Sequence, residues 1–297
     1  MKAYFALNEA GTAGDIALHT KIAVTTARDQ TDLELTLLYT GNRNDFTAWL
    51  EAHGVQVIDS KLPYLHLLER LTAEGRYHLM SVGHWLRTNV PLEEKDSDFL
   101  VYTDIDVVFQ GGIPTLDSPS YFSAAPEFKK DGWNYFNAGV MYVNVRSMRD
   151  TYDSFEEYLY ENISARTVNF HDQIAYNEFY RGKWERLPVD LNWKPYWGIN
   201  NKAPIVHFHG PKLGAIDAIL DDRWDWSNKH GVQIGSLFSN NIESYEFYIA
   251  RIMDIRGLSD EDYAFINAIL VKIRNAREII GNKPSDLSFT DYKMFPE

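Results

Sequence analysis

An apolar segment interrupted by two carboxylates, residues 99–109 (FLVYTDIDVVF), most constrains how this chain can fold. Such an apolar run is typical of a strand buried on both faces, as in a parallel sheet. Because unpaired carboxylates are costly to bury, we expect Asp104 and Asp106 at the carboxyl end of this strand, where open α/β sheets bind ligands. Residues two apart on an extended chain point the same way. The pair could therefore hold one hard cation, which could in turn hold phosphate oxygens.

Two other aspartate pairs have the same spacing, so the pattern alone does not identify a site. Asp96 and Asp98 precede the apolar run and are interpreted as a polar entry to the strand. Asp260 and Asp262 follow Ser259 and indicate a helix start, because acidic residues are favoured in the first helical turn. Only the pair inside the apolar run ends a buried strand. A simple polar turn remains the alternative to metal or phosphate chemistry there.

Composition excludes several classes of protein. The net charge of −13 argues against nucleic-acid binding, which requires a basic surface. The chain contains no cysteine, which excludes disulfides, zinc–thiolate sites and a cysteine nucleophile, and which fits a reducing compartment such as the cytoplasm. No apolar run approaches the roughly 20 residues of a membrane-spanning helix. The N-terminus is interpreted as a first strand and not as a signal peptide, so membrane contact would be peripheral at most.

Strands and helices alternate along the first part of the chain. Strands are predicted at 3–7, 33–39 and 55–58, helices at 15–28 and 46–53, and a helical stretch over 62–90 in two pieces that are separated near Gly75. Asp15 is the expected N-cap of the first helix, and Pro91 the expected end of the second piece. This alternation predicts an α/β fold with a mostly parallel, Rossmann-like sheet flanked by helices.

The later part of the chain continues this pattern and then changes. We predict strands at 121–125 and 140–145, followed by a helix at 150–162. Beyond Gly214, two amphipathic helices are predicted, at 242–255 and 260–280. The expected domains are one large α/β domain over 1–235 and a helical C-terminal appendage over 236–297.

A second polar cluster stands at the end of a short predicted strand, in the segment IVHFHGPK (205–212). The strand places His207 and His209 on one face, and the chain then turns at Gly210. One histidine could complete a site begun by two aspartates, and such a mixed oxygen and imidazole set suits manganese better than magnesium or calcium. Lys212 could neutralise a departing diphosphate.

Three residues and one aromatic segment have both structural and functional interpretations. Arg87 would either favour a helix C-terminus or contact phosphate. Asn137, two positions before a strand glycine, would either close a turn or bind a ligand hydroxyl. Asp172 stands at a helix N-cap position, and capping is its simpler interpretation. The aromatic residues of 193–197 would either pack in the core or stack on sugar rings.

Taken in order, these segments resemble glycosyltransferase family 8. The resemblance covers roughly residues 3–215 and rests on YTDIDVVF, FNAGVMYVNV, HDQIAYN, LPVDLN and HFHGPK. It implies a GT-A fold and metal-dependent transfer of a hexose from a UDP-sugar, with retention. The implied cofactor is Mn²⁺, with Mg²⁺ as a second choice. The implied acceptor is a glycan or a lipid-linked glycan, as in polysaccharide biosynthesis.

The resemblance also implies roles for individual residues. The metal ligands would be Asp104, Asp106 and His207, with His209 as the alternative. The donor-binding residues would be Asn8 near the uridine, Arg87, Asn137, Asp172, Gly210 and Lys212. The catalytic residues would be Gln173 and Asp172. We favour front-face attack, with Gln173 beside the reacting centre, over a carboxylate nucleophile, for which Asp172 is the candidate.

The chain departs from the family pattern at two places. Asn8 is followed by Glu9-Ala10-Gly11, where the family carries a tyrosine three positions on. Leu213 and Gly214 follow Lys212, where the family has a proline and a tryptophan. The contacts to the uridine and the setting of the lysine are therefore expected to differ in this chain.

Two other functions stay open. The nucleophile motif of haloacid-dehalogenase phosphatases also fits, with Asp104 as the nucleophile, although three predicted strands precede it and a later acidic pair is missing. A non-catalytic protein that binds a nucleotide sugar or a carbohydrate could carry the same residues on the same fold. Trapping a phosphoenzyme at Asp104 would favour the first, and donor binding without turnover the second.

Overall fold

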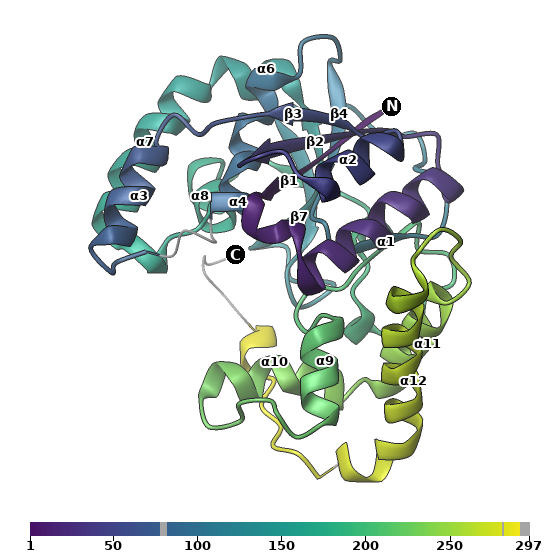
Figure 1. Ribbon diagram of the computed structural model, residues 1–297. Helices are drawn as coiled ribbons and strands as arrows, with labels where there is room; N and C mark the ends of the chain where they lie inside the picture. The colour runs from purple at the N-terminus through teal and green to yellow at the C-terminus, as the bar shows by residue number, and fades with distance from the viewer. Residues whose placement is uncertain (78–81, 281, 292–297) are drawn as a thin grey trace.

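A seven-stranded sheet organises the first part of the chain in the computed structural model, which describes residues 1–77, 82–280 and 282–291 (Figure 1). The strands are β1 (Lys2–Asn8), β2 (Glu34–Thr40), β3 (Gln56–Asp59), β4 (Phe99–Thr103), β5 (Val107–Phe109), β6 (Phe122–Pro126), β7 (Phe136–Asn144), β8 (Glu185–Arg186) and β9 (Ile205–His207). The order in the large sheet is β3-β2-β1-β4-β7-β6-β8, and only β7 runs antiparallel to its neighbours. The predicted mostly parallel sheet is confirmed.

The central apolar segment forms two strands. After β4 the chain bends, and β5 pairs antiparallel with β9 in a separate two-stranded sheet. Two backbone hydrogen bonds hold the bend: the Asp104 N–H donates to the Gly139 carbonyl at 2.7 Å, and the Phe208 N–H donates to the Asp106 carbonyl at 2.8 Å. The predicted buried strand therefore ends directly before Asp104, as expected, and Val107–Phe109 form a separate strand with a different partner.

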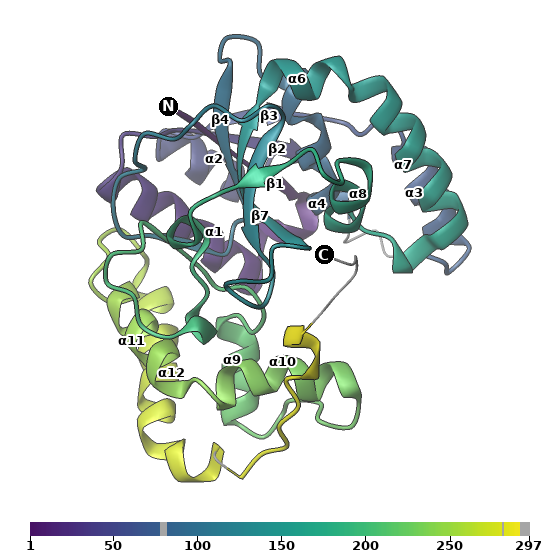
Figure 2. The ribbon, with the colours of Figure 1, turned by 180° about the vertical axis from the view of Figure 1, so that it is seen from behind.

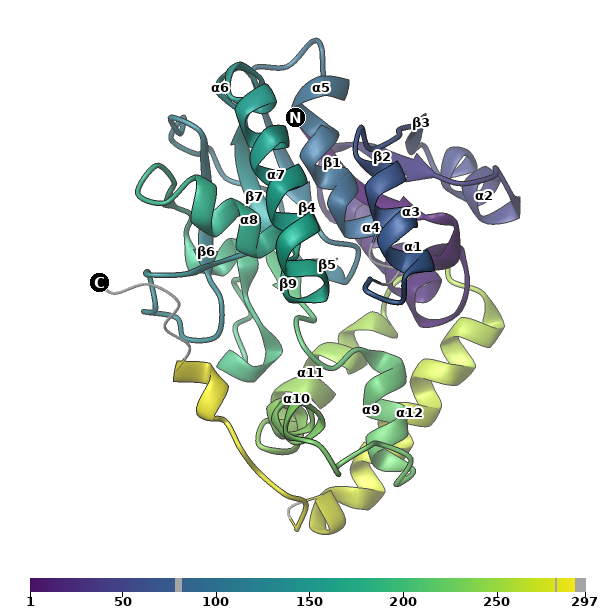
Figure 3. The same ribbon diagram turned by 90° about the vertical axis from the view of Figure 1, so that its left-hand side faces the viewer.

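Helices cover both faces of the large sheet (Figures 1 and 3). The helices are α1 (Gly14–Gln30), α2 (Asp45–Ala52), α3 (Leu65–Ala73), α4 (Val82–Trp85), α5 (Val90–Glu93), α6 (Val145–Asp150), α7 (Tyr152–Arg166), α8 (Asp172–Phe179), α9 (Leu213–Leu220), α10 (Lys229–Ser239), α11 (Ile242–Ile252) and α12 (Asp260–Ile280). The 3₁₀ helices are η1 (Glu9–Thr12), η3 (Leu86–Asn89), η4 (Thr167–Asn169), η5 (Val189–Asn192), η6 (Pro195–Trp197) and η7 (Ser288–Asp291). Side chains alternate along β1, so Tyr4 and Ala6 join the core under α3 and α8, whereas Phe5 and Leu7 join the core under α1 and α2.

The C-terminal helices form their own layer beside the sheet (Figure 2). Helices α9–α12 share a core with Leu18 and Ile22 of α1 and with Val206 and Phe208 around β9. The two amphipathic helices predicted near the C-terminus are present as α11 and α12. The division into domains at 235/236 stays a prediction; this position lies inside α10.

Three local expectations are wrong. Pro91 lies in the first turn of α5 and does not end a helix, since a proline lacks only an N–H that the first turn leaves unbonded. Asp15 and Asp172 are not N-caps: Ala13 and His171 occupy those positions. Both carboxylates bond to partners from other elements instead. Residues 78–81, inside the second of the two helical pieces predicted over 62–90, lie outside the described residues.

Within the described ranges, we find no helix with both the length and the apolar character needed to cross a bilayer.

Candidate functional site

Three of the predicted ligands lie together where β4, β5 and β9 meet. One carboxylate oxygen each of Asp104 and Asp106 and a ring nitrogen of His207 lie within 4.8 Å of one another. The His207 Nε2 is 3.2 Å from the Asp106 Oδ1 and 4.0 Å from the Asp104 Oδ2. Asp106 and His207 are buried, and Asp104 is partly exposed. Two carboxylates and one imidazole, open to solvent on one side, are a donor set that fits Mn²⁺.

A buried amide fixes the orientation of the His207 ring. The Asn137 atom next to Gly139 must be the amide oxygen, because it accepts a hydrogen bond from the Gly139 N–H. The Asn192 group 2.9 Å from the same oxygen must then be its NH₂, which donates. The Asn192 Oδ1 therefore faces the His207 Nδ1, 2.9 Å away, and accepts a hydrogen bond from its N–H. This leaves the Nε2 lone pair directed at the aspartates, as a metal-binding histidine requires.

Gly139 makes room for this histidine. A Cβ at Gly139 would lie 2.1 Å from the Cε1 of His207, which is far inside any permitted contact. A glycine inside a strand often marks such a close approach. The sequence analysis gave no role to Asn192, whose only signal was its place at the end of LPVDLN.

The amide chain continues from Asn137 to the predicted catalytic face. The Asn137 Nδ2 donates to the Gln173 Oε1 at 3.0 Å, and the Ala138 N–H donates to the same oxygen at 2.9 Å. The Gln173 Nε2 then donates to the Glu127 Oε2 at 2.8 Å. Gln173 is thus held from both ends of its amide. Asn137 does not merely close a turn, since it connects the histidine support to Gln173.

His209 lies outside the metal-ligand group. Its Nε2 is 3.0 Å from the Glu127 Oε1, and its Nδ1 is 2.7 Å from the Tyr196 hydroxyl. Burial would raise the pKa of Glu127, but the neighbouring His209 outweighs this effect and the pKa is lowered to about 2. Among the described residues, His207 and not His209 approaches the two aspartates. Glu127, which lies directly after β6, was not among the predicted metal-ligating, donor-binding or catalytic residues.

Arg87 connects the metal-ligand group to Asp172. Its Nη2 is 2.7 Å from the Asp104 Oδ1, and its Nε is 2.5 Å from the Asp172 Oδ2. The guanidinium is buried and lies 4.7 Å from the centre of the Tyr102 ring. Burial would raise the pKa of Asp172, but the positive charge of Arg87 holds this pKa below its usual range. A general preference for helix C-termini does not explain this placement, because two specific carboxylates surround the cation.

Lys212 gives the two aspartates different electrostatic environments. Its Nζ is 2.8 Å from the Asp106 Oδ2. Burial would raise the pKa of Asp106, but Lys212 and His207 hold this pKa well below its usual range. Burial raises the pKa of Asp104 despite Arg87, and the nearby Asp106 carboxylate adds to the rise. A divalent cation here would favour the charged form of both carboxylates.

The remaining predicted donor residues also lie at this edge of the sheet. Asn8 ends β1, next to β4, and its side chain accepts a hydrogen bond from the Gly11 N–H at 3.2 Å. Gly210 lies in the turn between β9 and α9 with φ of 91°, which favours glycine. Their contacts to a donor stay predictions.

A lysine that the sequence analysis did not single out is enclosed next to this site. Lys194 is fully buried, and its Nζ donates to the Pro126 carbonyl at 2.7 Å and lies 4.2 Å from the centre of the Trp197 ring. Burial lowers its pKa to about 7, although Glu127 opposes the change. Lys194 therefore holds the end of β6 in place, directly before Glu127.

Lys194 should make stability depend on pH above neutrality. Between its folded pKa of about 7 and the ordinary value of 10.5, the unfolded chain holds a proton that the folded chain has lost. The free energy of unfolding should then rise with pH, by at most about 1.4 kcal/mol per unit. Denaturant unfolding of the wild type and of Lys194→Met at pH 7, 8 and 9 measures this. The difference between the two profiles should change with pH; parallel profiles would contradict the assignment.

Two hollows lie outside the metal-ligand group. One, of about 760 Å³, is lined by the rings of Phe128, Tyr196 and Trp197 and by Asn240 and Asn241. It adjoins the site, since the Phe128 ring lies 5.2 Å from the His209 ring. Aromatic faces and amides are typical of carbohydrate contacts.

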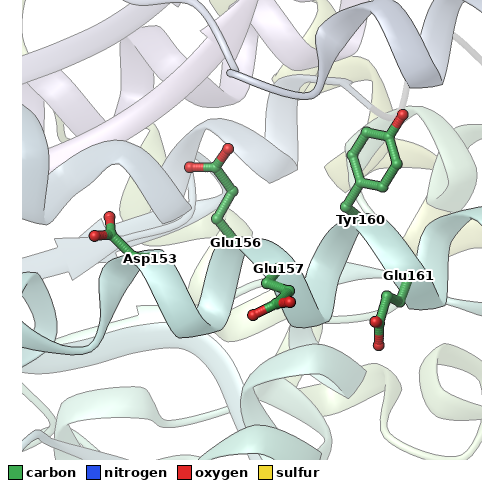
Figure 4. Close-up of a pocket in the computed structure, with 5 residues that line it drawn as sticks. All are labelled: Asp153, Glu156, Glu157, Tyr160 and Glu161. Atoms are coloured by element: carbon green, nitrogen blue, oxygen red, sulfur yellow. The ribbon is translucent and has the colours of Figure 1, made fainter.

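The other hollow, of about 530 Å³, lies along the outer face of α7 (Figure 4). Glu156 and Tyr160 project from one side of the helix, and Glu157 and Glu161 from another, with Asp153 at the start. These carboxylates form part of the acidic surface of the chain.

Comparisons with known proteins agree with this geometry. Residues 120–212 match the profile of glycosyl transferase family 8; the matched segment contains Asn137, Gln173, His207 and Lys212, and begins after the two aspartates. No curated protein matches the chain. Among solved structures, the fold is similar to that of galactosyltransferase LgtC in complex with donor and acceptor sugar analogues, with a TM-score of 0.58, 15% identity, and coverage of 89% of this chain and 100% of that one.

A second similar structure is glycosyltransferase GlyE of Streptococcus pneumoniae TIGR4, with a TM-score of 0.54, 15% identity, and coverage of 96% of this chain and 66% of that one. These likenesses show a shared fold, and the profile match adds the family signature. The resemblance inferred from the motifs is therefore confirmed: residues 120–212 carry the signature of glycosyl transferase family 8, and the chain has a GT-A fold.

Proposed function

We propose that this protein transfers a hexose from a UDP-sugar to a hydroxyl of a glycan, with retention and with Mn²⁺ as its cofactor. One observation carries the proposal: Asp104, Asp106 and His207 converge at the carboxyl edge of the sheet, with Lys212 and Arg87 on either side. Carboxylates with flanking cations at this edge suit a metal-bound diphosphate. The chemistry of the donor set supports manganese over magnesium.

The residues divide the work on the donor. Asp104, Asp106 and His207 would hold the metal ion, which supplies a Lewis acid for the leaving diphosphate when bound. Lys212 would move its amine from Asp106 to the phosphate oxygens, adding positive charge where negative charge develops. Asn8, at the end of β1, would contact the uridine.

A second set of residues would surround the donor sugar. Arg87, Asn137 and Asp172 would contact its hydroxyls. The Asp172 carboxylate is engaged by Arg87, which supports a binding role over attack on the sugar. Gln173 is held at both ends of its amide, which suits a fixed polar surface beside the reacting carbon. Both points favour front-face attack by the acceptor hydroxyl.

The acceptor would enter from the aromatic hollow. That hollow meets the site at His209, next to Glu127 and Gln173, and its rings could stack on a sugar. A glycan or a lipid-linked glycan would both fit this description. A cytoplasmic location, or one at the surface of a membrane, stays a prediction.

Donor hydrolysis across a panel of nucleotide sugars tests the proposal. We expect release of UDP from one UDP-sugar in the presence of Mn²⁺, and no release after chelation. Glucose-, galactose- and N-acetylglucosamine-linked donors, with matching GDP-sugars as controls, would identify the hexose. Adding a simple oligosaccharide series would then reveal the acceptor as a rise in turnover.

The same assay separates the alternatives. Hydrolysis of a phosphate monoester, with a phosphoenzyme trapped at Asp104, would replace the transferase by a phosphatase. Tight donor binding with no release in any acceptor series would indicate a non-catalytic binding protein. No comparison described above favours either alternative.

A further inference from the structure

Helix α1 holds the turn that carries Lys212. Helix α9 begins directly after this lysine, which occupies the N-cap position. The Leu213 N–H donates to the His19 Nε2 at 3.1 Å. The Gly214 N–H donates to the Asp15 Oδ1 at 3.0 Å. Both acceptors come from α1, one helical turn apart, so they lie on the same face of that helix.

These contacts replace a cap that Lys212 cannot provide. The first N–H groups of a helix need acceptors, which an N-cap side chain normally supplies. A lysine side chain has no acceptor, and this one extends to Asp106 instead. His19 and Asp15, which are distant in the sequence, supply the acceptors for the first N–H groups of α9. A proline at position 213, as the family pattern has, would lack the N–H that His19 receives.

The geometry around Gly214 shows that the fit is close. A Cβ at this position would lie 3.1 Å from both the Cγ and the Oδ2 of Asp15, so a side chain would press on the carboxylate. His19 is 1% exposed, and its ring lies 5.8 Å from that of Phe208. Burial also lowers the pKa of His19, which keeps the Nε2 lone pair available to the N–H. The His19 ring is thus enclosed on all sides, whereas the Asp15 carboxylate is held between the turn and solvent.

We propose that Asp15 and His19 are positioning residues that hold the Lys212 backbone so that its amine reaches the leaving diphosphate. The inference rests on the proposed function of Lys212. Gly210, two residues before the lysine, lies in the left-handed region, which glycine adopts readily. The two bonds from α1 fix the residues directly after the lysine. They thereby set where its Nζ can lie relative to Asp106.

A double-mutant cycle between His19 and Lys212 tests this. The measurement is the affinity for UDP, with uridine as the probe that lacks phosphate, both in Mn²⁺ by calorimetry or competition. Lys212→Met should weaken UDP binding by about tenfold or more and leave uridine binding unchanged. His19→Ala should weaken UDP binding by about fivefold in the wild type and by less than twofold in Lys212→Met, because positioning a lysine that is absent has no value.

Two further variants control for structural damage. His19→Gln keeps an acceptor near the Nε2 position and should recover most of the UDP affinity. Lys21→Met removes a different bond of the same helix, the one from Lys21 to Asp262 at 2.8 Å, without touching α9. It should leave the affinities for UDP and uridine unchanged. If His19→Ala does not fold, Gly214→Ala, which presses on Asp15, takes its place in the cycle.

The outcomes are distinguishable. If Lys212→Met weakens UDP binding and His19→Ala does not, the positioning role is wrong and the function of Lys212 stands. If His19→Ala weakens UDP and uridine equally, or weakens UDP equally in both backgrounds, the residue is only structural and the inference is overturned. If Lys212→Met has no effect on UDP, the proposed role of Lys212 is wrong, and the inference falls with it.

Discussion

Replacing Asp106 by asparagine should abolish metal-dependent turnover of the donor. The substitution keeps the shape of the side chain but removes a charge that His207 and Lys212 both contact. Loss of an outer partner of a metal ligand typically costs about 10- to 100-fold in metal affinity or activity. Loss of a ligand itself should cost more. Mn²⁺ titration and kcat/KM for donor hydrolysis measure the two effects, and both should fall together.

Asp96→Asn is the matched control for this experiment. Asp96 and Asp98 have the same spacing as the metal pair, but Asp96 is exposed and contacts Lys2 at the other end of β4. Its replacement should leave Mn²⁺ affinity and turnover unchanged. Normal turnover in Asp106→Asn would remove the metal site from the mechanism, whatever the control shows.

Arg87→Met should destabilise the fold as well as the site. The guanidinium lies between two carboxylates, and its removal leaves the buried Asp172 and the partly exposed Asp104 without their cation. Breaking a buried ion pair by removing one partner costs about 3–5 kcal/mol. Arg166→Met removes a more exposed pair with Glu178 and should cost about 1 kcal/mol or less. Chemical denaturation at neutral pH compares the two variants.

The pH dependence identifies the cause. In the wild type, Arg87 lowers the folded pKa of Asp172, so this ion pair stabilises the protein above the unfolded pKa and is lost as the pH falls through the folded one. Without the arginine, burial should raise the folded pKa of Asp172 above the unfolded value. The variant would then lose stability as the pH rises from acid to neutral. The gap between wild type and Arg87→Met should therefore be largest at pH 7 and shrink toward pH 4; a constant gap would indicate lost packing alone.

The sequence predicted the sheet better than its connections. Strand positions follow from local apolar runs and alternation, which a single chain displays directly. Strand pairing depends on residues far away, so the division of 99–109 between two sheets was not visible. The antiparallel course of β7 depends on the same long-range pairing with β4 and β6. Nothing local to that strand reports its direction.

The site was partly visible for a similar reason. Asp104, Asp106 and His207 are polar residues at the ends of apolar strands. Their side chains are of types that bind metal ions, so the sequence alone indicated a possible site. Asn192 and Lys194 act through partners that only the fold brings near them, so neither has a distinctive local pattern. Asp172 is not the N-cap residue, because His171 occupies that position, and the Asp172 carboxylate pairs with an arginine that is distant in the sequence.

The strand β9 also limits what sequence change can do here. Its side chains alternate: His207 faces the metal-ligand group, whereas Val206 and Phe208 enter the core beneath the C-terminal helices. A shift of one residue against β5 would exchange these sides, placing an imidazole in an apolar core and a benzyl group among carboxylates. An insertion within β9 should therefore destabilise the fold, whereas insertions in surface loops are generally tolerated. The burial of Val206 and Phe208 in that core therefore fixes the register that directs His207 toward Asp104 and Asp106.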